Sequence, residues 1–247
     1  MSSLPKNAAP VPRFVSLESP SKSLDGLTAS SELKAFGEAV CKQWTSTDKL
    51  AELANYGIYP IRQVLFYGPP GNGKTTACQW LGKRLEMPVY RVKSEAITGA
   101  YLGATQGNVG ELLAWLKTIG PAIVLFDEIE SLFPSREAGQ DSCARELQSA
   151  MTVLWQALDR WTTPQIFIFA TNMQERLDKA FVSRMEASLE FGPPTPEQIS
   201  AVVAYWCEIF HEYGAADWGP RLSVQGFISF RELWQAISNC VRASALA

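Results

Sequence analysis

The sequence predicts an α/β fold: a five-stranded parallel sheet covered by helices on both faces, followed by a small all-helical subdomain. Three observations lead to this expectation. Short apolar runs alternate with helical patterns through the middle of the chain, a glycine-rich loop joins the first of these runs to a helix, and only helical periodicity follows residue 193. Buried apolar strands separated by helices are typical of a parallel sheet with both faces covered.

The composition is that of an ordinary folded protein of 247 residues, with 47% hydrophobic and 19% charged residues. The net charge of −3 provides no global positive field that would attract nucleic acid or an anionic membrane. The single histidine, His211, excludes a histidine-based metal cluster and disfavours a nucleophile–histidine triad.

Five scattered cysteines, none paired at metal-ligand spacing, fit free thiols in a reducing compartment. No apolar run approaches the ~20 residues of a membrane span, and the N-terminus lacks the pattern of a secretory signal. We therefore expect a cytoplasmic protein that does not engage a membrane.

The elements are expected in three regions. Residues 1–30 are rich in serine and proline and predict a flexible arm or a strap over the body. Residues 31–193 are expected to form the α/β unit, and residues 194–247 the helical subdomain. The α/β unit begins with two helices within residues 32–56, and five apolar runs then predict strands at residues 63–67, 88–92, 122–126, 166–170 and 188–191.

The loop at residues 68–75 reads Gly-Pro-Pro-Gly-Asn-Gly-Lys-Thr, lies between an apolar strand and a helix, and fits G-x-x-x-x-G-K-[ST]. Such a loop turns its backbone N–H groups around phosphates. Lys74 would neutralise phosphate charge, and the Thr75 hydroxyl would bind Mg²⁺. The sequence therefore predicts a site for ATP and Mg²⁺. The expected binding residues are Pro70, Gly71, Asn72, Gly73, Lys74, Thr75 and Thr76.

Two carboxylates follow the strand at residues 122–126, at the edge of the sheet where ligands bind in such folds. Asp127 is expected to hold Mg²⁺ through water, and Glu128 to orient and polarise the attacking water. The alternative is that the pair only caps the next helix electrostatically.

Together, the loop, Leu-Phe-Asp-Glu-Ile-Glu-Ser-Leu at residues 125–132 and Phe-Ala-Thr-Asn at residues 169–172 resemble the AAA+ ATPases, and specifically the AAA subgroup. The resemblance covers about residues 50–243. It identifies the loop as Walker A and the Asp-Glu pair as Walker B. It implies that Asn172 is the sensor residue that places the lytic water, although a polar cap on the strand is the plainer interpretation.

The same resemblance implies two arginine roles. Arg184 ends a segment similar to the arginine-finger segment, and it would stabilise transition-state charge on the nucleotide of a neighbouring subunit. Here Met185 and Glu186 replace the usual Phe-Asp, and Phe181 replaces a second arginine, so a surface arginine remains the alternative. Arg231, near the start of the last helix of the helical subdomain, is a candidate cis sensor or a solvated helix residue.

Two further segments resemble parts of a ring-forming motor. Tyr101 and Leu102 stand where AAA proteins that thread polypeptides carry the central pore loop, although Tyr101 could instead fold back on its own domain. Residues 158–161 resemble the inter-subunit signalling turn. A homo-oligomer, expected to be a hexamer, is therefore the predicted active form. Residues 56–58 are weaker candidates for base contacts.

The leading functional hypothesis is a compact AAA ATPase, without a folded N-terminal adaptor domain, that uses Mg²⁺-dependent ATP hydrolysis to remodel, unfold or thread a protein client. Two alternatives remain at this stage. One is an ATP-controlled regulator or loader that assembles on DNA, which the acidic balance disfavours. The other is a nucleotide switch that scaffolds a partner protein such as a peptidase.

Overall fold

The structure is a computed structural model that describes residues 10–18, 31–46, 52–98, 104–133 and 142–246. Its centre is a six-stranded sheet in the order β1-β3-β4-β5-β2-β6. Strands β2 (Gln63–Tyr67), β3 (Val89–Lys93), β4 (Ala122–Asp127), β5 (Gln165–Thr171) and β6 (Ala187–Glu190) are parallel. These five strands confirm the predicted α/β fold class.

A sixth, antiparallel strand adds to the five predicted ones and lies within residues 1–30, for which the sequence predicts a flexible arm or a strap over the body. Strand β1 (Val15–Glu18) pairs antiparallel with β3, with Val15 opposite Val92 and Glu18 opposite Val89. The side chains of Phe14 and Val15 are buried in the core. This burial stabilises a short edge strand within a segment whose composition resembles a linker.

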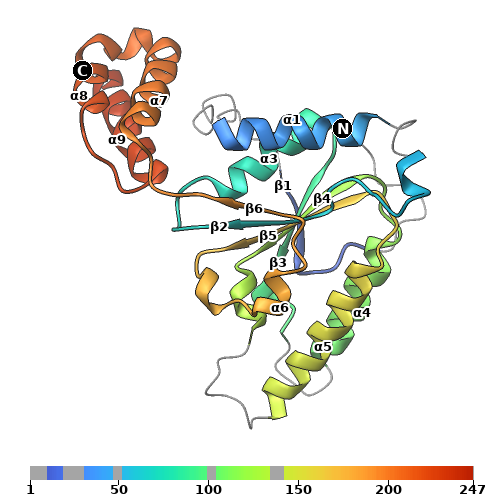
Figure 1. The fold of residues 1–247 in the computed structure, drawn as a ribbon. Helices are drawn as coiled ribbons and strands as arrows, with labels where there is room; N and C mark the ends of the chain where they lie inside the picture. The colour runs from blue at the N-terminus through green and yellow to red at the C-terminus, as the bar shows by residue number, and fades with distance from the viewer. Residues whose placement is uncertain (1–9, 19–30, 47–51, 99–103, 134–141, 247) are drawn as a thin grey trace.

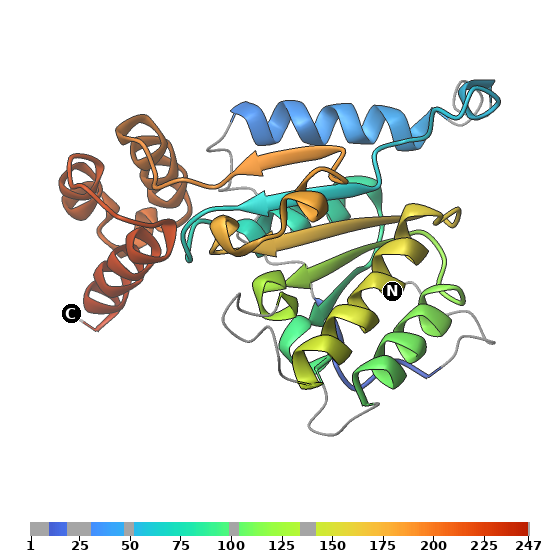
Figure 2. The same cartoon turned by 60° about the horizontal axis from the view of Figure 1, so that its bottom comes forward.

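Helices cover both faces of the sheet. Helices α1 (Ser31–Thr45) and α3 (Lys74–Leu85) lie on one side, and α4 (Ala104–Leu116) and α5 (Ser142–Asp159) lie on the other (Figures 1 and 2). Strand residues alternate between the two cores, as their period of two requires. On β2, Val64 and Phe66 pack on the α1 and α3 side, whereas Leu65 packs on the other side.

The helical subdomain, here called the lid, contains α7 (Pro196–Ile209), α8 (Ala215–Ser223) and α9 (Phe230–Ala245) around its own apolar core. Thr195 begins α7 with a capping box shared with Gln198. The lid lies beyond the edge of the sheet to which the parallel strands point (Figures 1 and 2). No helix in the described part of the chain is both long and apolar enough to span a bilayer.

The short elements of the body are the 3₁₀ turns η2 (Ser94–Ala96), η3 (Ile129–Leu132) and η5 (Gln174–Arg176), and helix α6 (Lys179–Val182). A further 3₁₀ turn, η6 (His211–Tyr213), lies in the lid between α7 and α8. The three turns of the body follow parallel strands at the edge near the lid, and η2 directly follows β3. Turn η3 follows β4 after Glu128, and η5 follows β5 two residues after Asn172. The ends of these strands therefore face the same space as the glycine-rich loop after β2.

Candidate nucleotide site

The glycine-rich loop joins β2 to α3 through backbone that L side chains rarely adopt. Gly68, Gly71 and Gly73 have φ angles of 131°, 84° and 92°, which explains why glycine occupies these positions. Gly73 is the N-cap of α3 and provides no side-chain cap. The first-turn N–H groups of α3 therefore have no capping side chain, as an anion site at a helix N-terminus requires.

The close approach at Gly68 leads to a stability prediction. A Cβ at this position would lie 2.4 Å from the carbonyl oxygen of Phe191, at a φ of +131°. Gly68→Ala is expected to lower the free energy of unfolding by about 2 to 4 kcal/mol, measured by urea denaturation. Gly192→Ala is the matched control, because its Cβ would meet nothing within 4 Å. Equal stability of the two variants would contradict this packing.

Lys74 is the buried cation of the loop. Its Nζ donates to the carbonyl oxygens of Gly68, at 2.6 Å, and Pro69, at 3.0 Å. Burial lowers the pKa of Lys74 from the ordinary value for lysine; Asp127 and Glu130 oppose this shift, and Arg231 adds to it. A desolvated ammonium group that neutral carbonyls hold is well suited to an incoming phosphate.

Asp127 ends β4 and Glu128 follows it, and both line the cavity that Lys74 also lines. The Oδ1 atom of Asp127 accepts the backbone N–H of Glu128 at 3.1 Å. Glu128 has a φ of 53°, in the left-handed region that a glutamate rarely adopts. Such strain concentrates at functional sites. The side chain of Glu128 is solvent-accessible at the cavity wall.

Asn172 reaches the same space from the neighbouring strand. It follows β5 directly, and its backbone N–H donates to Oε1 of Glu130 at 3.4 Å. Strand β5 lies between β4 and β2, so Asn172 stands between the carboxylates and the loop. A cavity of about 500 Å³ connects these elements. It is lined by Pro70, Gly71, Gly73, Lys74, Thr75, Thr76, Arg91, Asp127, Glu128, Asn172, Val202, Trp206, Phe230, Arg231 and Trp234.

Of the seven residues that the sequence predicts to bind nucleotide at this loop, Asn72 alone does not line the cavity. Its side chain is buried; its Nδ2 donates to the Phe191 carbonyl at 3.3 Å, and its Oδ1 accepts the N–H of Phe230 at 3.4 Å. The backbone N–H of Arg231 donates to the Gly71 carbonyl at 3.0 Å. The phosphate loop thus holds the first turn of α9 directly, which couples the lid to the loop.

The lid adds an aromatic wall that sequence reasoning missed. Trp206 and Trp234 contact each other with ring centroids 4.7 Å apart, and Phe230 and Val202 line the cavity beside them. In the sequence, the spacing of Val202 and Trp206 indicates only a helix. Residues 56–58, the weaker candidates for base contacts, do not line this cavity. An aromatic wall in the same cavity as the glycine-rich loop is suited to an aromatic base.

The residues that would hold Mg²⁺ fit that ion. Thr75 and Asp127 line one cavity and supply hydroxyl and carboxylate oxygens, and Mg²⁺ commonly takes few protein ligands beside phosphate and water. Within the described ranges, no group of three or more His, Cys, Asp or Glu side chains forms a dedicated metal cage. The donor set therefore suits an ion that arrives with a nucleotide.

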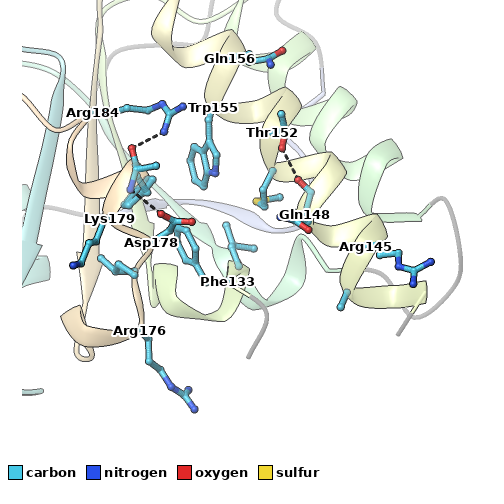
Figure 3. Close-up of a pocket in the computed structure, with 16 residues that line it drawn as sticks. Phe133, Arg145, Gln148, Thr152, Trp155, Gln156, Arg176, Asp178, Lys179 and Arg184 are labelled. Carbon is cyan, nitrogen blue, oxygen red and sulfur yellow. Dashed lines mark hydrogen bonds between the residues drawn. The ribbon is translucent and has the colours of Figure 1, made fainter. Parts of the chain in front are cut away.

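Arg184 lies in a different cavity, of about 600 Å³, between α5 and the segment around α6 (Figure 3). Its Nε pairs with Oδ2 of Asp159 at 3.2 Å, and its guanidinium donates to the Ala180 carbonyl at 2.5 Å. Arg145, Arg176 and Lys179 also line this cavity, so several cations border it. Asp159 belongs to the segment that resembles the signalling turn, so the structure joins these two features.

The departures from the family pattern near Arg184 have structural roles. Phe181 is buried and packs on Phe169, with ring centroids 5.2 Å apart. Glu186 accepts the backbone N–H groups of Arg62 and Gln63 at the start of β2. These two positions therefore hold the end of α6 against the sheet. The predicted pore-loop residues, Tyr101 and Leu102, lie outside the described residues.

The fold and the cavity define a P-loop nucleotide-binding protein, with the phosphate loop, the Asp-Glu pair and a polar strand end at one edge of a parallel sheet. Residues 64–193 match the family model described as "ATPase family associated with various cellular activities (AAA)". The chain belongs to this family of ATPases.

Curated relatives agree with this assignment. Spastin from Danio rerio is 27% identical over 139 residues, which cover 56% of this chain and 24% of spastin. A putative 26S proteasome regulatory subunit homolog from Methanothermobacter thermautotrophicus is 29% identical over 60% of this chain and 40% of its own length. The 26S proteasome regulatory subunit 8 homolog from Saccharomyces cerevisiae is 32% identical over 56% of this chain and 35% of its own length. The chain spans less than half the length of each of these relatives.

Proposed function

We propose that this chain performs Mg²⁺-dependent ATP hydrolysis in a homo-oligomeric ring, most simply a hexamer, and uses it to remodel, unfold or thread a protein client. One observation carries the proposal: Lys74, Asp127, Glu128 and Asn172 share one cavity, whereas Arg184 borders another. This separation is what an active site completed by a second copy of the chain requires.

Within one copy, the residues have distinct tasks. Lys74 and the N–H groups at the start of α3 bind the phosphates, and Thr75 and Asp127 hold Mg²⁺, which supplies charge neutralisation when bound. Glu128 accepts a proton from the attacking water, which Asn172 positions. The water oxygen bonds to the γ-phosphorus, the bond from that phosphorus to the β–γ bridging oxygen breaks, and ADP leaves. Arg231 acts as a cis sensor, a role supported by its place in the cavity and its effect on Lys74.

Between copies, we propose that Arg184 leaves Asp159 and stabilises the charge that develops on the neighbour's γ-phosphate. The half-exposed pair at 3.2 Å supports this, because an exposed ion pair contributes at most about 1 kcal/mol and is readily exchanged. Because Asp159 is the last residue of α5, loss of the pair would change the contacts at the end of α5 in the subunit that supplies Arg184.

The protein client is inferred from the relatives and from the sequence. Two of the relatives are named as homologs of 26S proteasome regulatory subunits. We propose that Tyr101 and Leu102 grip an extended polypeptide in the channel of the ring. The net charge of −3 favours a protein client over DNA.

Tyr101→Ala tests the grip on a polypeptide. The ratio of ATP turnover with and without an unfolded model protein is expected to fall to about one in the variant, because an aromatic contact is lost. Turnover is measured as phosphate release. Tyr213→Ala, at an exposed lid tyrosine, is the control and should keep the wild-type ratio. Full stimulation of the Tyr101→Ala protein would contradict threading. Stimulation by duplex DNA instead would favour the DNA alternative.

A further inference from the structure

A chain of charged side chains connects the N-terminal strand to the candidate Mg²⁺ ligand. Arg91 on β3 pairs with Oδ2 of Asp127 at 2.5 Å, and its other terminal nitrogen lies 3.9 Å from Oε1 of Glu18 on β1. Glu18 in turn accepts a hydrogen bond from Nε2 of Gln79 on α3 at 3.2 Å. Arg91 also lines the cavity that contains Lys74.

Arg91 occupies the part of Asp127 that a metal ion needs. The Oδ1 atom of Asp127 already accepts the Glu128 N–H, and Oδ2 bears the guanidinium. The carboxylate of Asp127 is only 15% exposed, so its two oxygens have little other access. Mg²⁺ and a guanidinium at the same carboxylate repel each other, so the presence of one at Asp127 weakens binding of the other there.

Glu18 offers Arg91 a second acceptor. Ser16 lies opposite Arg91 in the antiparallel register, and Glu18 lies opposite Val89, so Glu18 is the diagonal neighbour of Arg91 on one face of the sheet. The Nε atom of Arg91 is buried and makes no hydrogen bond within the described residues. A buried donor without a partner is costly. A position of Arg91 in which its Nε atom donates a hydrogen bond would therefore be more stable.

We propose that Arg91 is a positioning residue that holds Asp127 while nucleotide is absent and moves fully to Glu18 when Mg²⁺ and nucleotide bind. Strand β1 is then held more firmly in the nucleotide-bound chain, because Glu18 gains a charge-assisted partner. How firmly β1 is held therefore depends on whether Mg²⁺ and nucleotide are bound at the site. This inference rests on the Mg²⁺-dependent nucleotide site proposed above.

The test is a Mg²⁺ titration of the binding of a ribose-labelled fluorescent ADP to the full chain. Arg91→Met is expected to lower the Mg²⁺ concentration of the half-maximal effect by about threefold to tenfold, because the competing cation is gone. Glu18→Gln is expected to raise it by about twofold, because Arg91 loses its alternative acceptor. Arg91→Lys should lie between wild type and Arg91→Met. The opposite signs separate this role from general damage to the fold.

Lys93→Met is the matched control. Lys93 is on the same strand and lies opposite Asp127 in the register with β4, so its removal changes the local charge without touching the Arg91 pair. Hydrogen exchange of residues 15–18 is the second readout. Protection should rise on addition of Mg²⁺ and ADP to wild type, and should not change in Glu18→Gln.

Three results would overturn the inference. They are an unshifted Mg²⁺ midpoint in Arg91→Met, an equal shift in Lys93→Met, and weaker binding of ADP to Arg91→Met in EDTA, which would make Arg91 a phosphate ligand. Absence of Mg²⁺-dependent ADP binding in wild type would instead contradict the proposed site itself.

Discussion

Glu128→Gln is expected to lower kcat for ATP hydrolysis by about 10²- to 10⁴-fold, because glutamine cannot accept the proton of the attacking water. Nucleotide affinity should change little, since the proposed phosphate ligands are Lys74 and the N-terminus of α3. Phosphate release at saturating ATP and binding of a fluorescent ATP measure the two effects separately. The variant should therefore trap ATP-bound oligomers, which electron microscopy can count.

The control for this prediction is Glu175→Gln, at an exposed glutamate in η5 outside the cavity. It should leave both quantities at the wild-type level. Wild-type turnover in Glu128→Gln would remove Glu128 from the reaction. The strained backbone at Glu128 would then need another explanation.

Arg184→Ala is expected to lower kcat by about 10³- to 10⁵-fold, the range found when an arginine finger is supplied or removed. The affinity of an isolated copy for ATP should stay the same, because Arg184 does not line the nucleotide cavity. Arg184→Lys should restore little, because an ammonium group cannot reproduce the fork of the guanidinium. Turnover is measured at protein concentrations that favour oligomers.

Arg176→Ala is the matched control, because Arg176 lines the same cavity as Arg184 (Figure 3). A loss confined to Arg184 identifies the finger, whereas equal losses would assign both arginines to assembly of the ring. Weaker ATP binding by dilute, monomeric Arg184→Ala would contradict action in trans.

The main features of the fold could be predicted from the sequence because buried parallel strands are long apolar runs. All residues of β5 are buried, and β4 is buried except at Asp127. The glycine-rich loop could also be predicted. Its backbone conformation requires glycine at Gly68, Gly71 and Gly73, and two of these glycines, Gly68 and Gly73, belong to the short sequence motif.

Elements whose stability depends on distant partners escaped prediction. Strand β1 has four residues and forms only because Phe14 and Val15 find the core beside β3. Helix α8 contains Pro220 and Gly219, which normally argue against a helix. A Cβ at Gly219 would lie 2.5 Å from the Sγ of Cys207 on α7. The glycine therefore permits close packing of two lid helices, and no local pattern reveals this.

The parts of the candidate site that lie within one sequence motif could be predicted. The parts that are brought together from several elements could not. Arg91 lies on β3 between two buried residues, and its pairing with Asp127 depends on the strand order, which the sequence does not show. Trp206 and Trp234 come from two different lid helices, and they line the cavity together only in the folded lid. Asn72 stands inside the motif, yet its side chain serves the lid contact.

The central claim is that each active site is completed by a second copy of the chain, and mixing two inactive variants tests it most directly. Glu128→Gln keeps the finger and loses its own site, whereas Arg184→Ala keeps the site and loses the finger. In an equal mixture, about a quarter of the subunit contacts pair an intact site with an intact finger.

Phosphate release by this mixture should therefore recover to about a quarter of the wild-type rate, far above either variant alone. Arg184→Ala mixed with the double variant Glu128→Gln/Arg184→Ala provides the control and should stay inactive. Recovery in the first mixture alone is the predicted result. No recovery from mixed oligomers, with co-assembly verified by differently tagged chains, would contradict a site shared between two copies.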